Sequence, residues 1–158
     1  MINEITIKRF KAISEIMLPL DRTNLLIGSN NSGKSSVLQA VQFAVSVAQT
    51  MKEQGGEWRL GKMELAFPPD RLVYSPLRDI ASLCYNRFFS EGRAGIEMTF
   101  RGTPQTQATG AQPPTLVETS IGVKKGRGQN IKCTMIGRDL GGLFTPMNQP
   151  FSQPSHRI

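Results

Sequence analysis

The chain has 158 residues, of which 39% are hydrophobic and 20% charged, and its formal net charge is +7. These values are typical of a soluble globular domain and exclude a largely disordered chain. No apolar run reaches the length of about eighteen residues that a membrane span needs, and the N-terminus is charged where a signal peptide would be apolar, so we expect a cytoplasmic protein without a membrane partner.

The cysteines and the histidine do not form a recognisable framework. Cys84, Cys133 and the single histidine, His156, are widely separated, and no CxxC pair occurs. This spacing matches neither a disulfide scaffold nor a zinc site. We therefore expect two reduced, partly buried thiols.

The first part of the chain alternates apolar and polar residues with the period of a half-buried strand. This pattern predicts one strand around residues 5–8 and a second over 16–20, separated by a turn at 11–14. A continuous apolar run at 25–27 predicts a third strand that is buried on both faces.

An amphipathic helix is predicted after this third strand, ending before Gly55. Its expected apolar stripe comprises Val37, Val41, Ala44, Val45 and Ala48, widened by Leu38. Its expected polar face comprises Gln39, Gln42, Ser46 and Gln49.

The second half of the chain predicts fewer helices and more strands. Helical spacing over 77–89 indicates a second helix, and 96–100 is a strand candidate. The runs 116–123 and 129–136 flank a basic glycine-containing turn and predict an antiparallel hairpin.

Between the third strand and the helix lies the motif that predicts chemistry. Gly28-Ser29-Asn30-Asn31-Ser32-Gly33-Lys34-Ser35 fits the pattern GxxxxGK[ST] of a phosphate-binding loop. Glycine permits the backbone to turn its N–H groups towards phosphate oxygens, and the helix N-terminus adds unpaired N–H groups. Lys34 is expected to reach the β and γ phosphates, and the Ser35 hydroxyl to ligate magnesium. We therefore expect ATP and Mg²⁺ as cofactors.

The stretch ITIKRFKAISEIMLPLDRTNLLIGSNNSGKSSVLQAVQFA resembles the N-terminal segment of ABC-type ATPases in the SMC/RecF/OLD group. The likeness lies in two strands around a basic–aromatic turn and in a loop of the form GxNxSGKSS. The resemblance implies phosphate contacts from Asn30, Asn31, Ser32, Gly33, Lys34, Ser35 and Ser36, with Lys34 as the catalytic residue. It also implies that Lys11 approaches the nucleotide; a solvated turn lysine is the equally weighted alternative.

Other parts of that family's catalytic site are missing from the sequence. No apolar strand ends in the acidic pair that orients water, since 116–118 is too short and 135–139 is interrupted by glycine and arginine. The family's serine–glycine–glycine motif is also missing. Gln149 is, by position, a candidate for the family's magnesium-contacting glutamine, or else a polar residue of a tail. We therefore expect an N-terminal fragment, a truncated product or one part of a split ATPase.

These observations predict an α/β fold: an incomplete N-terminal lobe of a P-loop NTPase with an antiparallel β-subdomain. The expected segments are a nucleotide-binding lobe (1–54), a helical or irregular insert (55–92), an antiparallel β segment (93–138) and a tail or truncated linker (139–158).

Three functions fit the sequence. The first is an ATP-binding head that acts with DNA in repair or anti-phage defence, as a homodimer or with a partner head, and that hydrolyses ATP only when completed. The second is a small-molecule kinase or transferase, and the third is a non-hydrolysing module whose interface nucleotide stabilises. The basic turn 124–127 is a candidate contact for DNA phosphates, or a solvated hairpin tip.

Overall fold

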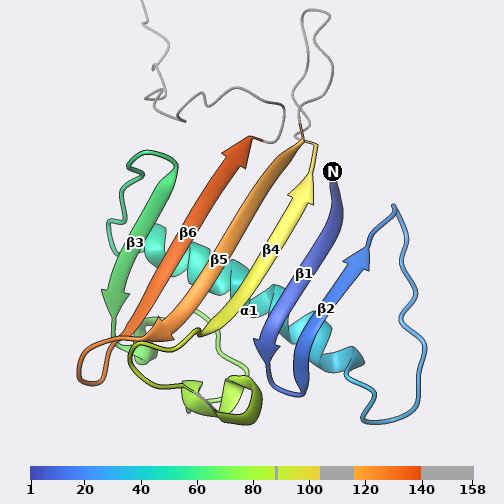
Figure 1. Cartoon of the computed structure of the whole chain (residues 1–158), viewed down its shortest axis with the longest axis horizontal. Helices are drawn as coiled ribbons and strands as arrows, with labels where there is room; N and C mark the ends of the chain where they lie inside the picture. Colours follow the sequence, from blue (N-terminus) through green and yellow to red (C-terminus); the bar gives the residue numbers. More distant parts are fainter. Residues whose placement is uncertain (88, 104–115, 140–158) are drawn as a thin grey trace, which may run out of the picture.

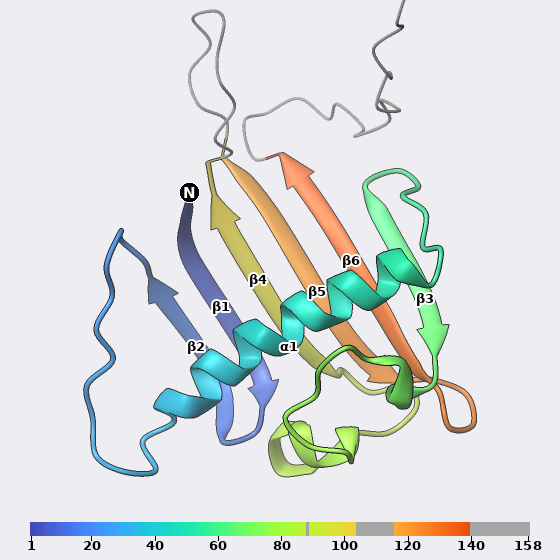
Figure 2. The same cartoon turned by 180° about the vertical axis from the view of Figure 1, so that it is seen from behind.

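The computed structural model describes residues 1–87, 89–103 and 116–139, and within them a six-stranded antiparallel sheet is crossed on one face by a single α-helix (Figures 1 and 2). The strand order is β2-β1-β4-β5-β6-β3. The elements are β1 (Ile2–Phe10), β2 (Ile13–Pro19), α1 (Lys34–Glu53), β3 (Lys62–Phe67), β4 (Ile96–Gly102), β5 (Val117–Lys125) and β6 (Ile131–Asp139). None of the helices in this described part is long and apolar enough to cross a membrane.

The register of the sheet follows the period-two patterns of the sequence. In the β1–β2 hairpin, Ile7 lies opposite Ile16, so their side chains share the face that α1 covers. The predicted hairpin in the second half is also confirmed, with Ile121 of β5 opposite Met135 of β6. β1 pairs with β4 on its other side, which places the N-terminal strand inside the sheet.

The core lies between the sheet and α1. The helix contributes Phe43, Val47 and Met51, none of which is solvent-exposed, and Phe43 lies against Phe10 at a ring-centroid distance of 5.9 Å. Burial of one such side chain stabilises the fold by roughly 1.5–3 kcal/mol. α1 contacts β1, β4, β5 and β6, so it holds the sheet together across most of its width.

The predicted orientation of α1 is partly wrong. Val45 and Leu38, assigned to the buried stripe, are 50% and 59% exposed, whereas Ser46, assigned to the polar face, is buried. Ser46 is buried at no cost in hydrogen bonding, because its Oγ accepts from the backbone N–H of Tyr74 at 2.7 Å. The helix is apolar around much of its circumference, and the side that holds the large Phe43 faces the sheet.

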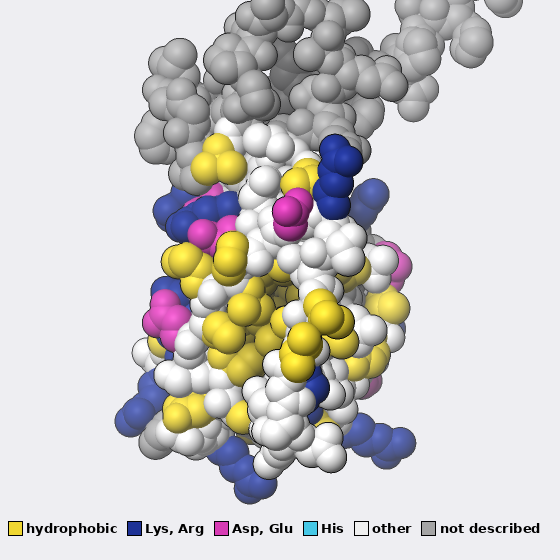
Figure 3. Space-filling view, turned by 90° about the vertical axis from the view of Figure 1, so that its right-hand side faces the viewer, with side chains coloured by type: hydrophobic (Ala, Val, Ile, Leu, Met, Phe, Trp, Pro, Cys, Tyr) yellow, Lys and Arg dark blue, Asp and Glu magenta, His cyan; other side chains and the backbone are white. Residues whose placement is uncertain are grey.

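The predicted third strand is also wrong. Leu25, Leu26 and Ile27 are 80%, 40% and 83% exposed and lie in an irregular segment. A strand that is buried on both faces needs a hydrogen-bonding neighbour and a layer over each face, and the described elements supply neither. Figure 3, viewed from the β2 side, shows hydrophobic side chains gathered around a hollow in this side of the molecule.

Two further local predictions differ from the structure. The helix expected over 77–89 is replaced by two short 3-10 turns, η2 (Ile80–Leu83) and η3 (Tyr85–Arg87). Asp79 caps η2 by accepting from Ala81 N, but Asn86 has φ of +53°, which is incompatible with a continuous helix. β3 was not predicted, although the sequence KMELAF alternates with period two. The prolines that follow it indicated an irregular segment instead.

The two thiols are buried, as expected. Burial raises the pKa of Cys133 to about 12 and also raises the pKa of Cys84, so both favour the neutral form in the folded chain.

Candidate phosphate-binding site

The segment that follows β2 runs along the outer side of this edge strand and then leads to the first turn of α1, on the sheet face that the helix crosses (Figure 2). The motif from Gly28 to Ser35 occupies the last part of this segment. The α-helix begins at Lys34, and the Val37 N–H donates to Gly33 O at 3.0 Å to start its ladder.

Lys34 closes the loop around its own ammonium group. Its Nζ donates to Gly28 O and Ser29 O, each at 2.6 Å, and to Ser32 Oγ at 3.2 Å. An ammonium group has three donors, so all three are engaged in the ligand-free loop, and a phosphate that binds Lys34 would replace at least one of these contacts. The loop therefore has its curved shape before any anion arrives, which lowers the entropy cost of binding.

Two residues of the motif have backbone conformations that few side chains tolerate. Gly33 has φ of +90°, and Asn31, a residue type that tolerates this region better than most, has φ of +71°. A Cβ at Gly28 would lie 2.6 Å from Ser32 Oγ, so the Ser32 side chain would have to rotate away from its contact with Lys34 Nζ. The glycines of the motif thus match the conformations that this loop adopts.

The N-terminus of α1 is arranged to receive an anion. No side chain caps it, and its first turn contains no acidic residue. The first N–H groups of a helix lack intrahelical partners and sit at the positive end of the helix dipole. Ser35 is exposed in this turn and Ser36 is half-buried, while Asn30, Asn31 and Ser32 lie exposed in the loop before it. Their roles in nucleotide binding stay predictions.

Lys11 lies against the same helix. Its Nζ donates to Gln39 Oε1 at 2.7 Å, one turn beyond Ser35. The structure therefore places Lys11 in contact with the helix that the phosphate loop leads into. The contact of Lys11 with nucleotide stays a prediction. The contact between Lys11 and Gln39 was not predicted, because the sequence indicates Gln39 only as part of the polar face of α1. The spacing of four residues between Gln39 and Ser35 was the available signal that the two share one face of the helix.

The predicted magnesium ligands are only partly placed. The Ser35 hydroxyl is an oxygen donor of the kind that Mg²⁺ prefers, and it lies exposed next to the loop. Within residues 1–87, 89–103 and 116–139, no group of three or more His, Cys, Asp or Glu side chains could hold a metal ion. Gln149 lies outside the described residues. The described chain thus offers one ligand and would need others from the nucleotide and from elsewhere.

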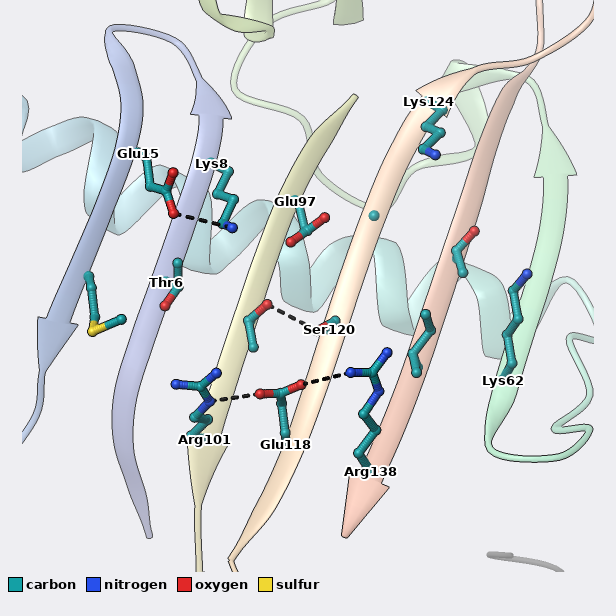
Figure 4. Close-up of a pocket in the computed structure, with 15 residues that line it drawn as sticks. Thr6, Lys8, Glu15, Lys62, Glu97, Arg101, Glu118, Ser120, Lys124 and Arg138 are labelled. Atoms are coloured by element: carbon teal, nitrogen blue, oxygen red, sulfur yellow. Dashed lines mark hydrogen bonds and ion pairs between the residues drawn. The ribbon is translucent and has the colours of Figure 1, made fainter. Parts of the chain in front are cut away.

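The sheet face opposite α1 bears charged side chains that are paired with one another (Figure 4). Glu118 accepts from Arg101 Nε at 2.7 Å and lies 3.9 Å from Arg138, and Arg101 also contacts Glu4 at 2.8 Å. The hydrogen bond to Glu118 raises the pKa of Arg101. Lys8 pairs with a neighbouring strand's carboxylate at 3.2 Å. Because these charges are paired, the part of the face around Glu118 is not a candidate for binding a polyanion.

Two hollows of the surface lie away from the phosphate loop. One, of about 460 Å³, lies on the open sheet face, and another, of about 640 Å³, lies beside Pro68, Pro69 and Arg78. Neither is lined by residues of the loop. A phosphate loop binds with backbone groups at a helix end and needs no deep cavity, so we place the candidate site at the loop.

Comparison with known families supports this placement. Residues 1–67 match the family model described as an AAA ATPase domain. The matched stretch includes β1, β2, the loop with Lys34, α1 and β3. The similarity supports an ATP-binding function and an N-terminal region of the AAA ATPase type. A comparison with curated proteins found no significant match.

Proposed function

We propose that this chain is the ATP-binding N-terminal lobe of an ATPase resembling the SMC/RecF/OLD group. The observation that supports this most is the loop from Gly28 to Ser35, which is closed around the Lys34 ammonium and continues into an uncapped helix N-terminus. In this proposal the backbone N–H groups from Asn30 to Ser36 and the Lys34 ammonium bind the phosphates. Lys11 adds a second positive charge from the neighbouring turn.

Magnesium fits the proposed site through the Ser35 hydroxyl, with Gln149 as a further candidate ligand. A bound magnesium ion would neutralise charge on the β and γ phosphates. Hydrolysis also needs a carboxylate to orient the attacking water, and the described residues place no acidic cluster there. We therefore assign nucleotide binding to this chain. We assign the carboxylate that orients the attacking water to a further lobe.

The exposed apolar surface supports a further lobe. The run 25–27 precedes the phosphate loop, and Leu38 and Val45 are exposed on the outer side of α1. Isolated exposed leucines are ordinary, but a run of three directly before the phosphate loop in the chain, followed by exposed apolar residues on the helix after it, is typical of a contact surface. In this proposal a lobe bearing the acidic strand covers that surface, and two completed heads then enclose ATP as a homodimer or with a partner head.

The cellular role belongs to the same proposal. Proteins of this group act with DNA in repair or anti-phage defence, and we place the chain in the cytoplasm in such a role. The β5–β6 turn offers Lys124 and Arg127 to a phosphate backbone, whereas Lys125 Nζ is held by Gly128 O in its own turn.

ATP turnover by the isolated chain tests whether hydrolysis needs a further lobe. We expect the wild type to bind ATP with turnover close to background, and Lys34→Ala to show the same background turnover, because the water-orienting carboxylate is missing. Robust turnover that Lys34→Ala abolishes would contradict the need for a further lobe. Phosphoryl transfer to a small acceptor would instead indicate a kinase, and nucleotide-dependent dimerisation without turnover in the completed protein would indicate a non-hydrolysing module.

A further inference from the structure

The turn between β1 and β2 is held from two sides. The Lys11 backbone N–H donates to Leu83 O at 2.6 Å, and the Lys11 Nζ donates to Gln39 Oε1 at 2.7 Å. The preceding Phe10 is fully buried and packs against Phe43 of α1. The backbone and the ammonium group of Lys11 are therefore restrained independently.

The same turn has an uncommon backbone conformation. Lys11 has φ of +52° and Arg9 has φ of +57°, values that non-glycine residues rarely adopt. The Arg9 guanidinium is anchored in turn, donating to Gly95 O at 2.5 Å and lying 3.8 Å from Glu97. Phe10 pairs with Ile13, so Lys11 lies in a two-residue hairpin turn, a type of turn that uses positive φ. The turn geometry and the anchored Arg9 together fix where Lys11 lies.

The position of Gln39 links this turn to the phosphate loop. Gln39 follows Ser35 by four residues, so both lie on one face of α1 with Cβ atoms about 5–6 Å apart. The Lys11 ammonium, bonded to Gln39, thus contacts the helix face that bears Ser35, at a residue one turn further along α1. The Ser35 hydroxyl marks the end of the helix that receives phosphate in the proposed function.

We propose that Gln39 is a positioning residue, whose amide oxygen holds the Lys11 ammonium beside the phosphate loop so that Lys11 contacts the terminal phosphates of ATP. This inference rests on the proposed function. A glutamine suits the task because its amide is neutral: it restrains the ammonium without cancelling the charge that attracts phosphate. One hydrogen bond to Gln39 also leaves two of the three ammonium donors for the ligand.

The test compares ATP and ADP binding, by titration calorimetry, in the full 158-residue chain and its variants. Gln39→Met keeps the length of the side chain and removes the acceptor. Gln42→Met is the matched control, because Gln42 is an exposed glutamine three residues further along the same helix. Lys11→Met and the double variant Lys11→Met/Gln39→Met complete a thermodynamic cycle. Gln39→Ala is measured in parallel, and thermal melts show which variants are folded.

We expect Gln39→Met to weaken ATP binding about three- to tenfold, the size of one neutral hydrogen bond's contribution, with a smaller effect on ADP. Lys11→Met should weaken it at least as much, and the double variant should be no worse than Lys11→Met alone. Gln42→Met should match the wild type. A merely structural role would lower the melting temperature without changing the ratio of ATP to ADP affinity.

Additive losses in the double variant, or unchanged ATP binding in both Gln39 variants, would overturn the inference while Lys34-dependent ATP binding left the proposed function intact. A wild-type chain whose ATP binding does not depend on Lys34 would overturn both. The same ATP-to-ADP ratio in Gln39→Met and in the wild type would also overturn the positioning role.

Discussion

Gly33 is the residue at which the phosphate loop becomes a helix. Its φ of +90° is accessible to glycine and costly for residues with a Cβ, and nothing lies within 4 Å of the position a Cβ would take. Substitution there therefore changes backbone strain alone, without a clash. This separates the conformational requirement of the motif from its packing.

We expect Gly33→Ala to destabilise the folded chain by about 1–2 kcal/mol, or to shift the loop and weaken ATP binding, because alanine must adopt a left-handed conformation. Urea unfolding and ATP titration measure the two effects. Gly122→Ala in β5 is the control: the atom nearest to the added Cβ would be Ile96 O of β4, 3.9 Å away, and alanine suits a strand interior better than glycine. A Gly33→Ala chain as stable and as active in binding as the wild type would contradict this account of the motif.

At the scale of elements, α1 has one face against the sheet and another that is exposed. Val47 is fully buried and Val45 is 50% exposed, although they are only two residues apart. We expect Val47→Ala to lower the free energy of unfolding by about 2 kcal/mol, through lost burial and a cavity. Val45→Ala should change it by less than about 0.5 kcal/mol. Equal losses in urea unfolding would mean that the orientation of α1 is wrong.

The edge strand β3 is attached to β6 partly through charge. Hydrogen bonds from Lys132 and Lys62 lower the pKa of Glu64 from 4.5 to about 2. Since the pKa is lower in the folded chain, the stabilisation is complete above pH 4.5 and disappears as the pH falls towards 2. Glu64 is partly exposed, which makes the contribution small and sensitive to salt.

We expect Glu64→Gln to be less stable than the wild type at pH 7 and to converge with it as the pH falls from 4.5 towards 2. Urea unfolding as a function of pH measures the difference. Glu91→Gln, at an exposed position in the connection before β4, should follow the wild-type curve throughout. A Glu64→Gln deficit that persists unchanged at pH 2 would show that charge is not its source.

Local periodicity predicted most elements, because side-chain alternation and helical spacing are properties of neighbouring residues. β1, β2, β4, the β5–β6 hairpin and the extent of α1 followed from the sequence. The face of α1 that is buried did not, because Val45 and Val47 are equally apolar and only the sheet distinguishes them. The run 25–27 failed for a similar reason: its apolar character indicates burial, but burial needs a partner layer.

In the candidate site, too, features set by neighbouring residues were predicted and contacts between distant residues were not. The motif from Gly28 to Ser35 is contiguous, so its residue types alone predict the loop and its chemistry. The bond between Lys11 and Gln39 joins residues that are 28 positions apart, and it depends on how the β1–β2 turn meets α1. Contacts of that kind need the folded chain.

At the scale of the whole molecule, the described chain combines a preformed phosphate loop with an exposed apolar side. The sheet and α1 form one core, whereas the run 25–27 and the outer stripe of α1 contribute little to it. In the proposed function, a further lobe covers this exposed surface. Nucleotide binding is the part of that proposed function assigned to the described lobe alone.

ATP binding to the wild-type chain and to Lys34→Ala, measured by titration calorimetry with magnesium present, tests that claim most directly. The three hydrogen bonds of Lys34 Nζ lie within its own loop. Lys34→Ala should therefore keep the fold and the melting temperature of the lobe. We predict saturable binding by the wild type and a loss of at least about tenfold in affinity in Lys34→Ala, as expected for a charge-assisted hydrogen bond to phosphate. Equal ATP affinity in the two folded chains, or no binding by the wild type, would contradict the account.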